Sequence, residues 1–407
     1  MKCIGKETSE QLAVIPELMY ILQHIRYKYA CQLCEQGIKV APMPPQPIPK
    51  SIASPELLSY IVVSKCEDHL PLYRQEKKFL RSGVELSRQT LSSWVIRCGE
   101  LVLPLCNLML DEINGYDIAY CDETKVQVLK EPGRAPQTKS MMWVLGGGAP
   151  ERFCYLFHYS PSRAHTIARG LLEDFKGYLH CDGYGGYDAL SNQIAQIILV
   201  ACWYHVRRRF VKAARVNKKQ GLAYQALRMI RQLSDIEKKA KAQNLPPEQI
   251  KELRLCEAIP ILNQFHDWLE ANKDLVPPKS LLGDAMHYAL NQWQKLLIYT
   301  TDGRLEISNN LLERNIKGFA LSRRNWLFCD TVEGVIALAR LFSLIQTCKH
   351  HTINSYAYFT YIFRQLPLCQ TVEDFEKLLP YNIDKKLLDQ YLPDARKTFA
   401  ELMKLQI

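Results

Sequence analysis

Two carboxylates in this 407-residue sequence follow short apolar runs of the kind that form buried strands. Asp122 follows the run at 118–121, and Asp182 follows the run at 178–181. A carboxylate at the end of a buried strand is costly to desolvate unless it meets a cation, and oxygen ligands of this kind suit Mg²⁺. Joined by a third acid, they can hold the metal ions that act on the attacking and leaving oxygens in phosphoryl transfer. The sequence therefore predicts a metal-dependent site for phosphodiester chemistry.

Glu313 is the best candidate for the third acid. Ser308 is expected to cap a helix on which Leu312 and Phe319 face the sheet. Glu313 lies beside that apolar stripe. Glu306 is the alternative, and it precedes the cap by two residues, where a loop is expected. A single acid after an apolar run more often marks a turn, so the prediction depends on the acids occurring together.

A change in hydrophobic period after residue 115 indicates the elements that position these acids. Three β-rich stretches predict successive antiparallel strands, at 117–129, 140–148 and 152–160. A helix at 162–175, a strand with its loop at 177–190 and a further strand at 195–206 follow. This βββαβαβ pattern predicts an α/β fold with a mixed sheet covered by helices. The charged residues from about 207 to 299 then have a helical spacing.

Composition excludes several classes of protein. Hydrophobic residues make up 47% and charged residues 23%, which is typical of a globular chain and not of a disordered or collagen-like one. The most apolar stretch, 194–204, falls short of the roughly 20 residues that span a bilayer, and the charged start does not resemble a signal peptide. The fourteen cysteines are mostly isolated, which favours a reducing cytoplasm. We therefore expect no membrane association.

The chain carries 52 Lys and Arg against 42 Asp and Glu, and the placement of this excess suggests a polyanionic partner. Arg207, Arg208 and Lys212 form a basic segment beside the predicted site. Because acids repel phosphates, such cations are needed if the site acts on DNA. Arg323 and Arg324 form a second basic cluster. A solvated helix face is the ordinary alternative for both.

A proline-rich linker is expected at 41–55, followed by a small helical module. In this module a Gly83 turn and an N-cap at Ser87 separate two helices, which is the outline of a helix-turn-helix. Arg88 and Gln89 begin the second helix and would contact DNA. Short helix pairs are also common in modules that bind nothing.

Several long motifs occur in an order that is similar to one known family. They are YACQLCEQG, LPLYRQEKKFLRSGVELSRQTLSSWV, the DET at 122–124, CDGYGGYDAL, CWYHVRRRF and DGRLEISNNLLERNIKGFALSRRNWLF. Through them the chain resembles the transposases of the insertion-sequence-66 family, a branch of the Asp-Asp-Glu (DDE) recombinases with an RNase H-like catalytic fold. The sequence departs from the family pattern at Ser308, where an Asp is usual, and at Ser322, where a Gly is usual.

The resemblance implies that Asp122, Asp182 and Glu313 form a metal-binding catalytic triad in an RNase H-like mixed sheet with a helical insertion. The domains are then expected as a zinc-binding remnant at 1–40, the linker at 41–55, the helical DNA-binding module at 56–112, the first catalytic part at 113–212, the insertion at 213–300, the end of the catalytic domain at 301–350 and a C-terminal helical segment at 351–407.

Cys202 and His205 have the spacing of a Cys-x-x-His signature that follows the second acid in several DDE families. A buried thiol and a single structural hydrogen bond are the alternative. His205 is a candidate to contact the scissile phosphate or a carboxylate, and Asn310 is a second possible auxiliary residue. No second ligand pair lies nearby in the sequence, so a metal role for Cys202 and His205 is not expected.

Structural zinc is not expected at the N-terminus either. Cys31 and Cys34 supply two ligands, and a closed site needs four. In the resembling family the other pair lies upstream, where this sequence has only Cys3, with His24 as a conceivable fourth ligand. We therefore expect an N-terminally shortened member of the family.

The function expected is DDE transposition: Mg²⁺- or Mn²⁺-dependent DNA cleavage and strand transfer at the ends of an insertion sequence. Implied partners are terminal-repeat and target DNA, a second copy of the chain, and accessory proteins of the same element, in the bacterial cytoplasm at the nucleoid. A catalytically silent, truncated remnant that only binds DNA is the alternative. An RNase H-like nuclease acting on RNA hybrids is a third, but it does not account for the motifs outside the triad.

Overall fold

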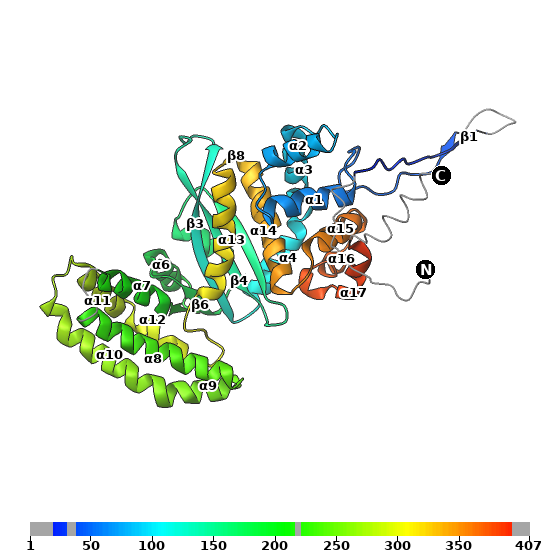
Figure 1. The fold of residues 1–407 in the computed structure, drawn as a ribbon. Helices are drawn as coiled ribbons and strands as arrows, with labels where there is room; N and C mark the ends of the chain where they lie inside the picture. The colour runs from blue at the N-terminus through cyan, green and yellow to red at the C-terminus, as the bar shows by residue number, and fades with distance from the viewer. Residues whose placement is uncertain (1–18, 31–37, 216–220, 393–407) are drawn as a thin grey trace, which may run out of the picture.

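A mixed sheet with helices on and beside it forms the centre of the computed structural model, which describes residues 19–30, 38–215 and 221–392 (Figure 1). The predicted α/β class is confirmed. A separate antiparallel pair, β1 (Lys28–Tyr29) and β2 (Lys39–Val40), lies far from this sheet.

The strands of the main sheet run in the order β5-β4-β3-β6-β7. Pairing is antiparallel from β5 to β3 and parallel from β3 to β7. Their bounds are β3 Ile118–Lys130, β4 Lys139–Gly147, β5 Cys154–Ser160, β6 Gly177–Cys181 and β7 Ile197–Ala201. The first four residues of β3 are buried, because this strand lies between two neighbours and both faces are covered.

A strand that the sequence does not predict, β8 (Cys329–Thr331), pairs in parallel with the far end of β3. It has only three residues. A segment this short carries no period-two pattern that could distinguish it from a loop.

Helices α13 (Asn310–Trp326) and α14 (Val332–His350) lie against the sheet (Figure 1). The ring of Phe157 on β5 packs 6.0 Å from Phe319 and 5.8 Å from Phe342, measured between centroids. The N–H of Phe157 also donates to the Ser343 hydroxyl at 2.8 Å, and the N–H of Tyr155 donates to Thr347 at 3.1 Å. Helix α14 therefore satisfies edge-strand donors that would otherwise be open to pairing.

Two groups of terminal helices pack beside α14. They are α1 Pro55–Cys66, α2 Leu72–Arg81, α3 Arg88–Leu101, α4 Leu103–Asn114, α15 Ser355–Gln365, α16 Val372–Glu376 and α17 Lys385–Leu388. The predicted cap at Ser87 is confirmed, since its hydroxyl accepts from the Thr90 N–H at 3.1 Å. Taken singly, no helix in the described part is both long and apolar enough to cross a bilayer. Only α3 and α4 together reach that length and composition, with a 45° bend between them.

The connections within and after the sheet are helical. Helices α5 (His165–Leu171) and α6 (Gly185–Gln193) join its parallel strands. After β7 the chain enters a lobe of helices at one side of the sheet (Figure 1). Its members are α7 Trp203–Ala214, α8 Leu222–Ala242, α9 Pro247–Leu253, a π-helical turn Arg254–Ala258, α10 Ile259–Asn272, α11 Leu281–Asn291 and α12 Trp293–Leu297.

Arg254, which is only 2% exposed, anchors the loop by which the chain returns from this lobe. Its guanidinium donates to the carbonyls of Tyr299, Asp302 and Leu305 at 2.7, 2.9 and 2.9 Å. It also forms two hydrogen bonds to the Glu237 carboxylate, at 2.9 and 2.7 Å. All five donors of the side chain are thereby used.

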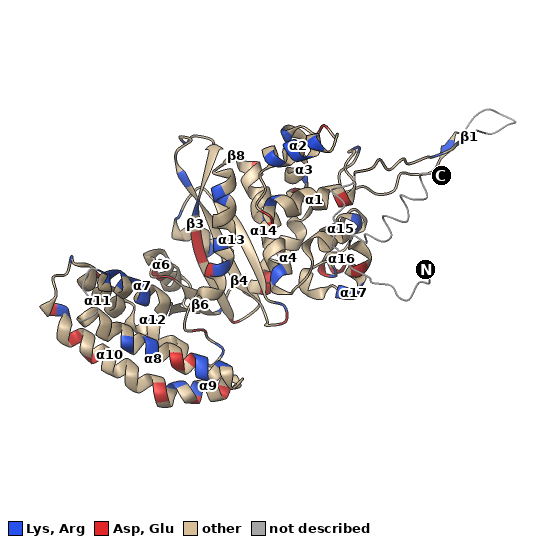
Figure 2. Cartoon of the chain, in the orientation of Figure 1, with Lys and Arg blue, Asp and Glu red and all other residues tan. Residues whose placement is uncertain are grey.

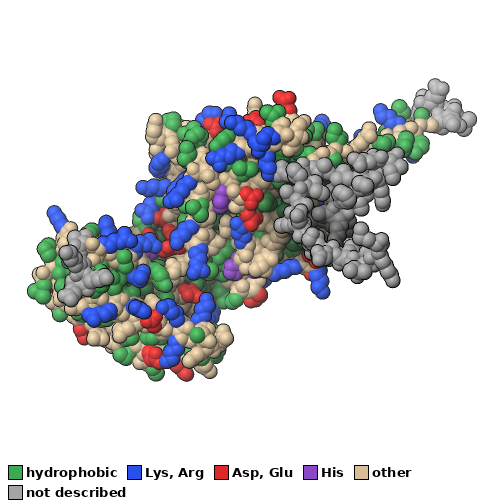
Figure 3. All heavy atoms as spheres, in the orientation of Figure 1, with side chains coloured by type: hydrophobic (Ala, Val, Ile, Leu, Met, Phe, Trp, Pro, Cys, Tyr) green, Lys and Arg blue, Asp and Glu red, His purple; other side chains and the backbone are tan. Residues whose placement is uncertain are grey.

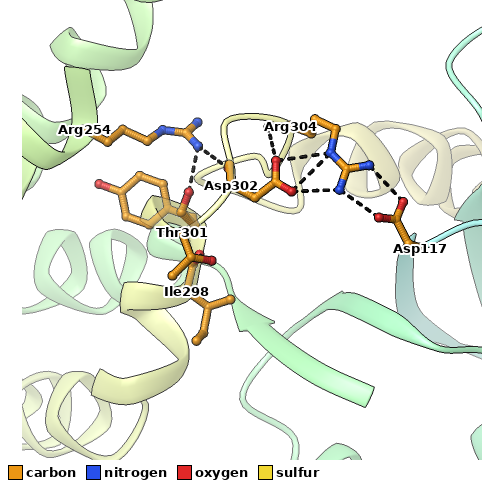
Figure 4. A network of polar contacts seen from close by, with 7 residues as sticks. Asp117, Arg254, Ile298, Thr301, Asp302 and Arg304 are labelled. Atoms are coloured by element: carbon orange, nitrogen blue, oxygen red, sulfur yellow. Dashed lines mark hydrogen bonds and ion pairs between the residues drawn. The ribbon is translucent and has the colours of Figure 1, made fainter. Parts of the chain in front are cut away.

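Arg304 continues this network toward the sheet (Figure 4). It binds both oxygens of Asp117, which precedes β3, at 3.0 and 2.7 Å, and binds Asp302 at 2.7 Å. The loop that leads into α13 is thus tied to the lobe on one side and to the sheet on the other.

We expect Arg254→Ala to lower the free energy of unfolding by about 3–5 kcal/mol, because it leaves the half-buried Glu237 carboxylate and three loop carbonyls, two of them in buried hydrogen bonds, without their donor. Urea denaturation followed by circular dichroism measures the change. Arg97→Ala, which removes an exposed pair with Glu100, is the control and should cost less than about 1 kcal/mol. Equal losses in the two variants would contradict the anchoring role.

Candidate active site

Asp122 and Asp182 come from neighbouring parallel strands. β3 and β6 pair in a register that sets Tyr120 opposite His180, and two residues further on the same register sets Asp122 level with Asp182. Asp182 directly follows β6, whereas Asp122 lies inside β3, still paired with Val144 of β4. The expectation that both acids follow strand ends is therefore wrong for Asp122, because β3 runs past the end of β6 as one arm of a hairpin.

The charge of Asp122 is opposed by its surroundings. Burial raises its pKa to about 7, and the carboxylates of Glu123, Asp182 and Glu313 act in the same direction. The backbone N–H of Glu123, which donates at 2.7 Å, opposes this rise in pKa. Asp182 instead accepts a hydrogen bond from the Tyr184 N–H at 2.9 Å. Like charges are concentrated at this edge of the sheet without enough cations to balance them.

Glu313 lies in the first turn of α13, and its carboxylate faces the same region. One oxygen accepts from the Arg208 guanidinium at 2.9 Å, and the other lies 3.8 Å from His205 Nε2. An open pocket of about 510 Å³ is lined by Asp122, His205, Arg208, Glu313, Ile316 and Lys317. Asp182 does not line this pocket, but its charge acts on both Asp122 and His205.

Glu306, the alternative third acid, does not line the pocket, although its charge acts on Tyr120 of β3. The charged groups that act on Glu306 are Glu237, Arg254 and Lys241, all in the helical lobe. The structure therefore brings Glu313, and not Glu306, beside Asp122.

Ser308 does not cap α13, contrary to expectation. The helix begins at Asn310, and Asn309 occupies the cap position. Both residues before the helix are buried, and the N–H of Asn309 donates to Cys202 Sγ at 3.2 Å. Because of this packing against the start of α7, α13 begins one residue later in the sequence than a cap at Ser308 would place it. Asn310 is the first helical residue, half-buried and one turn before Glu313.

The donor set of the three acids suits a divalent cation. Oε1 of Glu313 is buried without a hydrogen-bond partner among the described residues. The pKa of Asp122 shows that its carboxylate lacks compensation. Oxygen donors in this state fit the preference of Mg²⁺ or Mn²⁺.

Glu123 and Arg163 are residues of this region that the sequence analysis missed. The Glu123 carboxylate accepts from the Tyr187 hydroxyl at 2.8 Å and from Arg163 Nε at 2.6 Å. Arg163 also acts electrostatically on Asp182 and stacks on the Tyr184 ring, 3.9 Å from its centroid. Alternation along β3 is the signal that could have placed Glu123 on the face opposite Asp122.

Cys202 and His205 lie close to Glu313. One ligand atom from each of the three lies within 4.8 Å of the others. Burial raises the pKa of the Cys202 thiol, and backbone hydrogen bonds, that of Asn309 first, oppose this rise. Burial lowers the pKa of His205, while Glu313 raises it. The sequence offers no second ligand pair near Cys202 and His205, but in the structure α13 brings one further ligand group, Glu313, from a distant part of the sequence.

The basic segment of α7 divides into paired and unpaired cations. Arg208 binds Glu313, and Arg209 binds Asp284 at 2.7 Å. Arg207 and Lys212 are exposed, and neither forms an ion pair within the described ranges. These two are available to a polyanion beside the pocket.

Helix α13 carries a second set of cations. Arg314, Lys317 and Arg324 are exposed, and Arg323 is half-buried. Their spacing puts the exposed three on one side of the helix. Basic residues thus occur on both helices that border the acids (Figure 2), and Lys and Arg side chains are spread over this face of the molecule (Figure 3).

Arg88 and Gln89 lie at the exposed start of α3. The N–H of Arg88 donates to Glu76 on α2 at 2.7 Å, which links the two helices. One face of α3 is buried: a Cβ at Gly99 would clash with Ala337 of α14 at 2.5 Å. The first turn and the outer face, which carries Ser93, Arg97 and Glu100, are exposed.

Comparison with known families places the protein among transposases. A model described as the transposase IS66 family matches residues 50–337, and a model of the IS66 C-terminal element matches residues 343–381. The chain belongs to the IS66 transposase family, as the motifs predict.

Two relatives come from Sinorhizobium fredii (strain NBRC 101917 / NGR234). The uncharacterized protein y4jD is 31% identical, over 93% of this chain and 76% of its own length. The uncharacterized protein y4qI is 30% identical, over 93% of this chain and 71% of its own length.

The model of the zinc-finger binding domain of the same transposases matches residues 1–35. This match conflicts with the expectation of a remnant without structural zinc. Cys3, Cys31 and Cys34 lie outside the described residues, and His24 is exposed.

We expect Asp122→Asn to stabilise the protein in the absence of divalent metal, increasingly so as the pH rises from about 4 to about 7. In this window native Asp122 keeps a proton that an unfolded Asp, with a pKa of about 3.9, has lost, so wild-type stability falls with rising pH. Thermal unfolding in EDTA across this range measures the difference. Asp267→Asn, at an exposed position of α10, is the control. A pH dependence as large in the control would contradict the effect of burial.

Proposed function

We propose that this protein is a DDE transposase, whose RNase H-like domain cleaves DNA at the ends of an insertion sequence and joins the freed 3′ hydroxyl to target DNA. The observation that carries the proposal is the convergence of three acids. Asp122 and Asp182 come from adjacent parallel strands and Glu313 from a helix, next to a pocket bordered by cations. Membership of the IS66 family supports the same reaction.

Mg²⁺ or Mn²⁺ held by Asp122, Asp182 and Glu313 would supply activation of the nucleophile and stabilisation of the leaving oxygen. The chain's own residues prepare this step. Asp122, with a pKa of about 7, must give up its remaining proton to serve as a ligand. Arg208 holds one oxygen of Glu313, and this fixes the orientation of the carboxylate.

DNA would approach along the two basic helices. The unpaired cations of α7 and α13 flank the acids and offset the repulsion between carboxylates and phosphates. His205 lines the pocket and would contact the scissile phosphate.

The remaining roles lie outside the catalytic site. We assign Arg88 and Gln89, at the start of α3, to contacts with terminal-repeat DNA, and the N-terminal residues to a zinc finger. Joining two element ends requires at least two copies of the chain. Accessory proteins of the same element are further candidate partners.

Asp122→Asn should reduce Mg²⁺-dependent cleavage of element-end DNA by at least about 100-fold, since loss of even an outer-shell partner of a metal site commonly costs 10- to 100-fold. Asp182→Asn and Glu313→Gln should behave alike, with DNA binding retained. Glu306→Gln is the matched control and should cleave normally. Loss of cleavage in Glu306→Gln but not in Glu313→Gln would refute the triad. Absence of cleavage by the wild type, with DNA binding intact, would favour the DNA-binding remnant.

We expect the double variant Arg207→Gln, Lys212→Gln to bind DNA with a shallower dependence of log K on log salt. Each lost phosphate contact should reduce the slope by about 0.9 for duplex DNA. Fluorescence anisotropy at several salt concentrations measures it. The control pair, Arg231→Gln and Lys238→Gln, removes cations of α8 that are already paired with Asp235. An unchanged slope in the α7 variant would leave those cations as a solvated helix face.

A further inference from the structure

We propose that Cys202, His205 and Glu313 form a binding site for a thiophilic divalent ion such as Zn²⁺. The three ligand atoms lie within 4.8 Å of one another, and His205 Nε2 is 3.8 Å from Glu313 Oε1. The ion would bind Oε1 of Glu313, the oxygen that Arg208 does not contact. The metal site itself stands on this geometry alone, and only its effect on DNA cleavage rests on the proposed function.

The local fold holds these side chains in place. Cys202 follows β7 directly and is the N-cap of α7, so its Sγ lies at the start of that helix. Sγ also accepts the N–H of Asn309 at 3.2 Å. The N–H of Trp203 donates to the carbonyl of Ile307 at 3.1 Å. The starts of α7 and α13 are therefore joined, and His205 and Glu313, each within the first turn, face one another.

Glu313 Oε1 is buried and has no hydrogen-bond partner among the described residues. Arg208 binds only the other oxygen of Glu313. A cation bound to Oε1 and to His205 Nε2, which lies 3.8 Å away, would satisfy this unpaired oxygen.

The donor types select the ion. One sulfur, one imidazole nitrogen and one carboxylate oxygen form a set that suits Zn²⁺, while Mg²⁺ prefers oxygen alone. Three protein ligands beside an open pocket leave a fourth position for water. Binding would release the proton of the Cys202 thiol to solvent as the metal–sulfur bond forms.

Occupation of this site has a consequence for the acids. Glu313 cannot turn toward Asp122 and Asp182 while it ligates an ion beside Cys202. Zn²⁺ would therefore inhibit Mg²⁺-dependent cleavage by removing the third acid.

Co²⁺ titration of the full chain tests the site, because thiolate-bound Co²⁺ absorbs in the near ultraviolet. The N-terminal cysteines can bind metal too, so Cys31→Ser, Cys34→Ser serves as the parent in every metal-binding arm, and the cleavage assays use the wild-type background. Cys202→Ser should lose one bound equivalent and its thiolate band, while Cys256→Ser, which removes an exposed cysteine, should lose neither. His205→Asn should keep the band and weaken Co²⁺ binding at least tenfold, an independent test if Cys202→Ser fails to fold.

Equal Co²⁺ stoichiometry and absorption in Cys202→Ser and its parent would overturn the proposal. So would unchanged affinity in His205→Asn. Relief by Cys202→Ser of Zn²⁺ inhibition in the cleavage assay would support it. A wild-type chain that never cleaves element-end DNA, beside a parent that binds Co²⁺ as expected, would refute the proposed function and leave this site standing.

Discussion

The buried guanidinium of Arg254 is the interaction on which the geometry of the site depends. After β7 the chain leaves the sheet, forms a lobe of helices and returns only at the loop before α13. Sheet pairing cannot position Glu313, because its helix is not part of the sheet. Arg254 holds three carbonyls of the returning loop, and Arg304 ties the same loop to Asp117 ahead of β3. Together they fix the point at which the third acid re-enters.

A second constraint is the concentration of negative charge at one edge of the sheet. Asp182 and Glu313 both act electrostatically on Asp122, and Glu123 adds a fourth carboxylate on the opposite face of β3. Arg163 and Arg208 compensate from two sides, but the raised pKa of Asp122 shows that compensation is incomplete. The uncompensated negative charge lowers the stability of the native chain, which is typical of a site shaped for a ligand.

The position of Glu313 between two kinds of donor gives the site its chemical character. Toward β3 its neighbours are carboxylates, and toward α7 they are a thiol and an imidazole. The same side chain thus stands at the boundary between a hard oxygen site and a softer mixed one. In the two proposals made for this site, the side that the carboxylate faces would determine which ion binds.

The sequence by itself determined the elements that carry the first two acids. Apolar runs before Asp122 and Asp182 predict strands, and the family motifs select Glu313. The cap at Ser87 was likewise readable, because capping depends on neighbours within one turn. Features that depend on residues close in the sequence can be recognised from the sequence, and these features were sufficient to predict the α/β class and the candidate acids.

Only the tertiary structure decided how these pieces meet. The position of Asp122 inside β3, the strand β8, the cap at Asn309 and the contact of Cys202 with Glu313 all depend on segments that are far apart in the chain. Register between distant strands and the docking of one helix start on another are set by packing and hydrogen bonds across the whole core. No periodicity within a short window records them, because the partners that fix them are absent from that window.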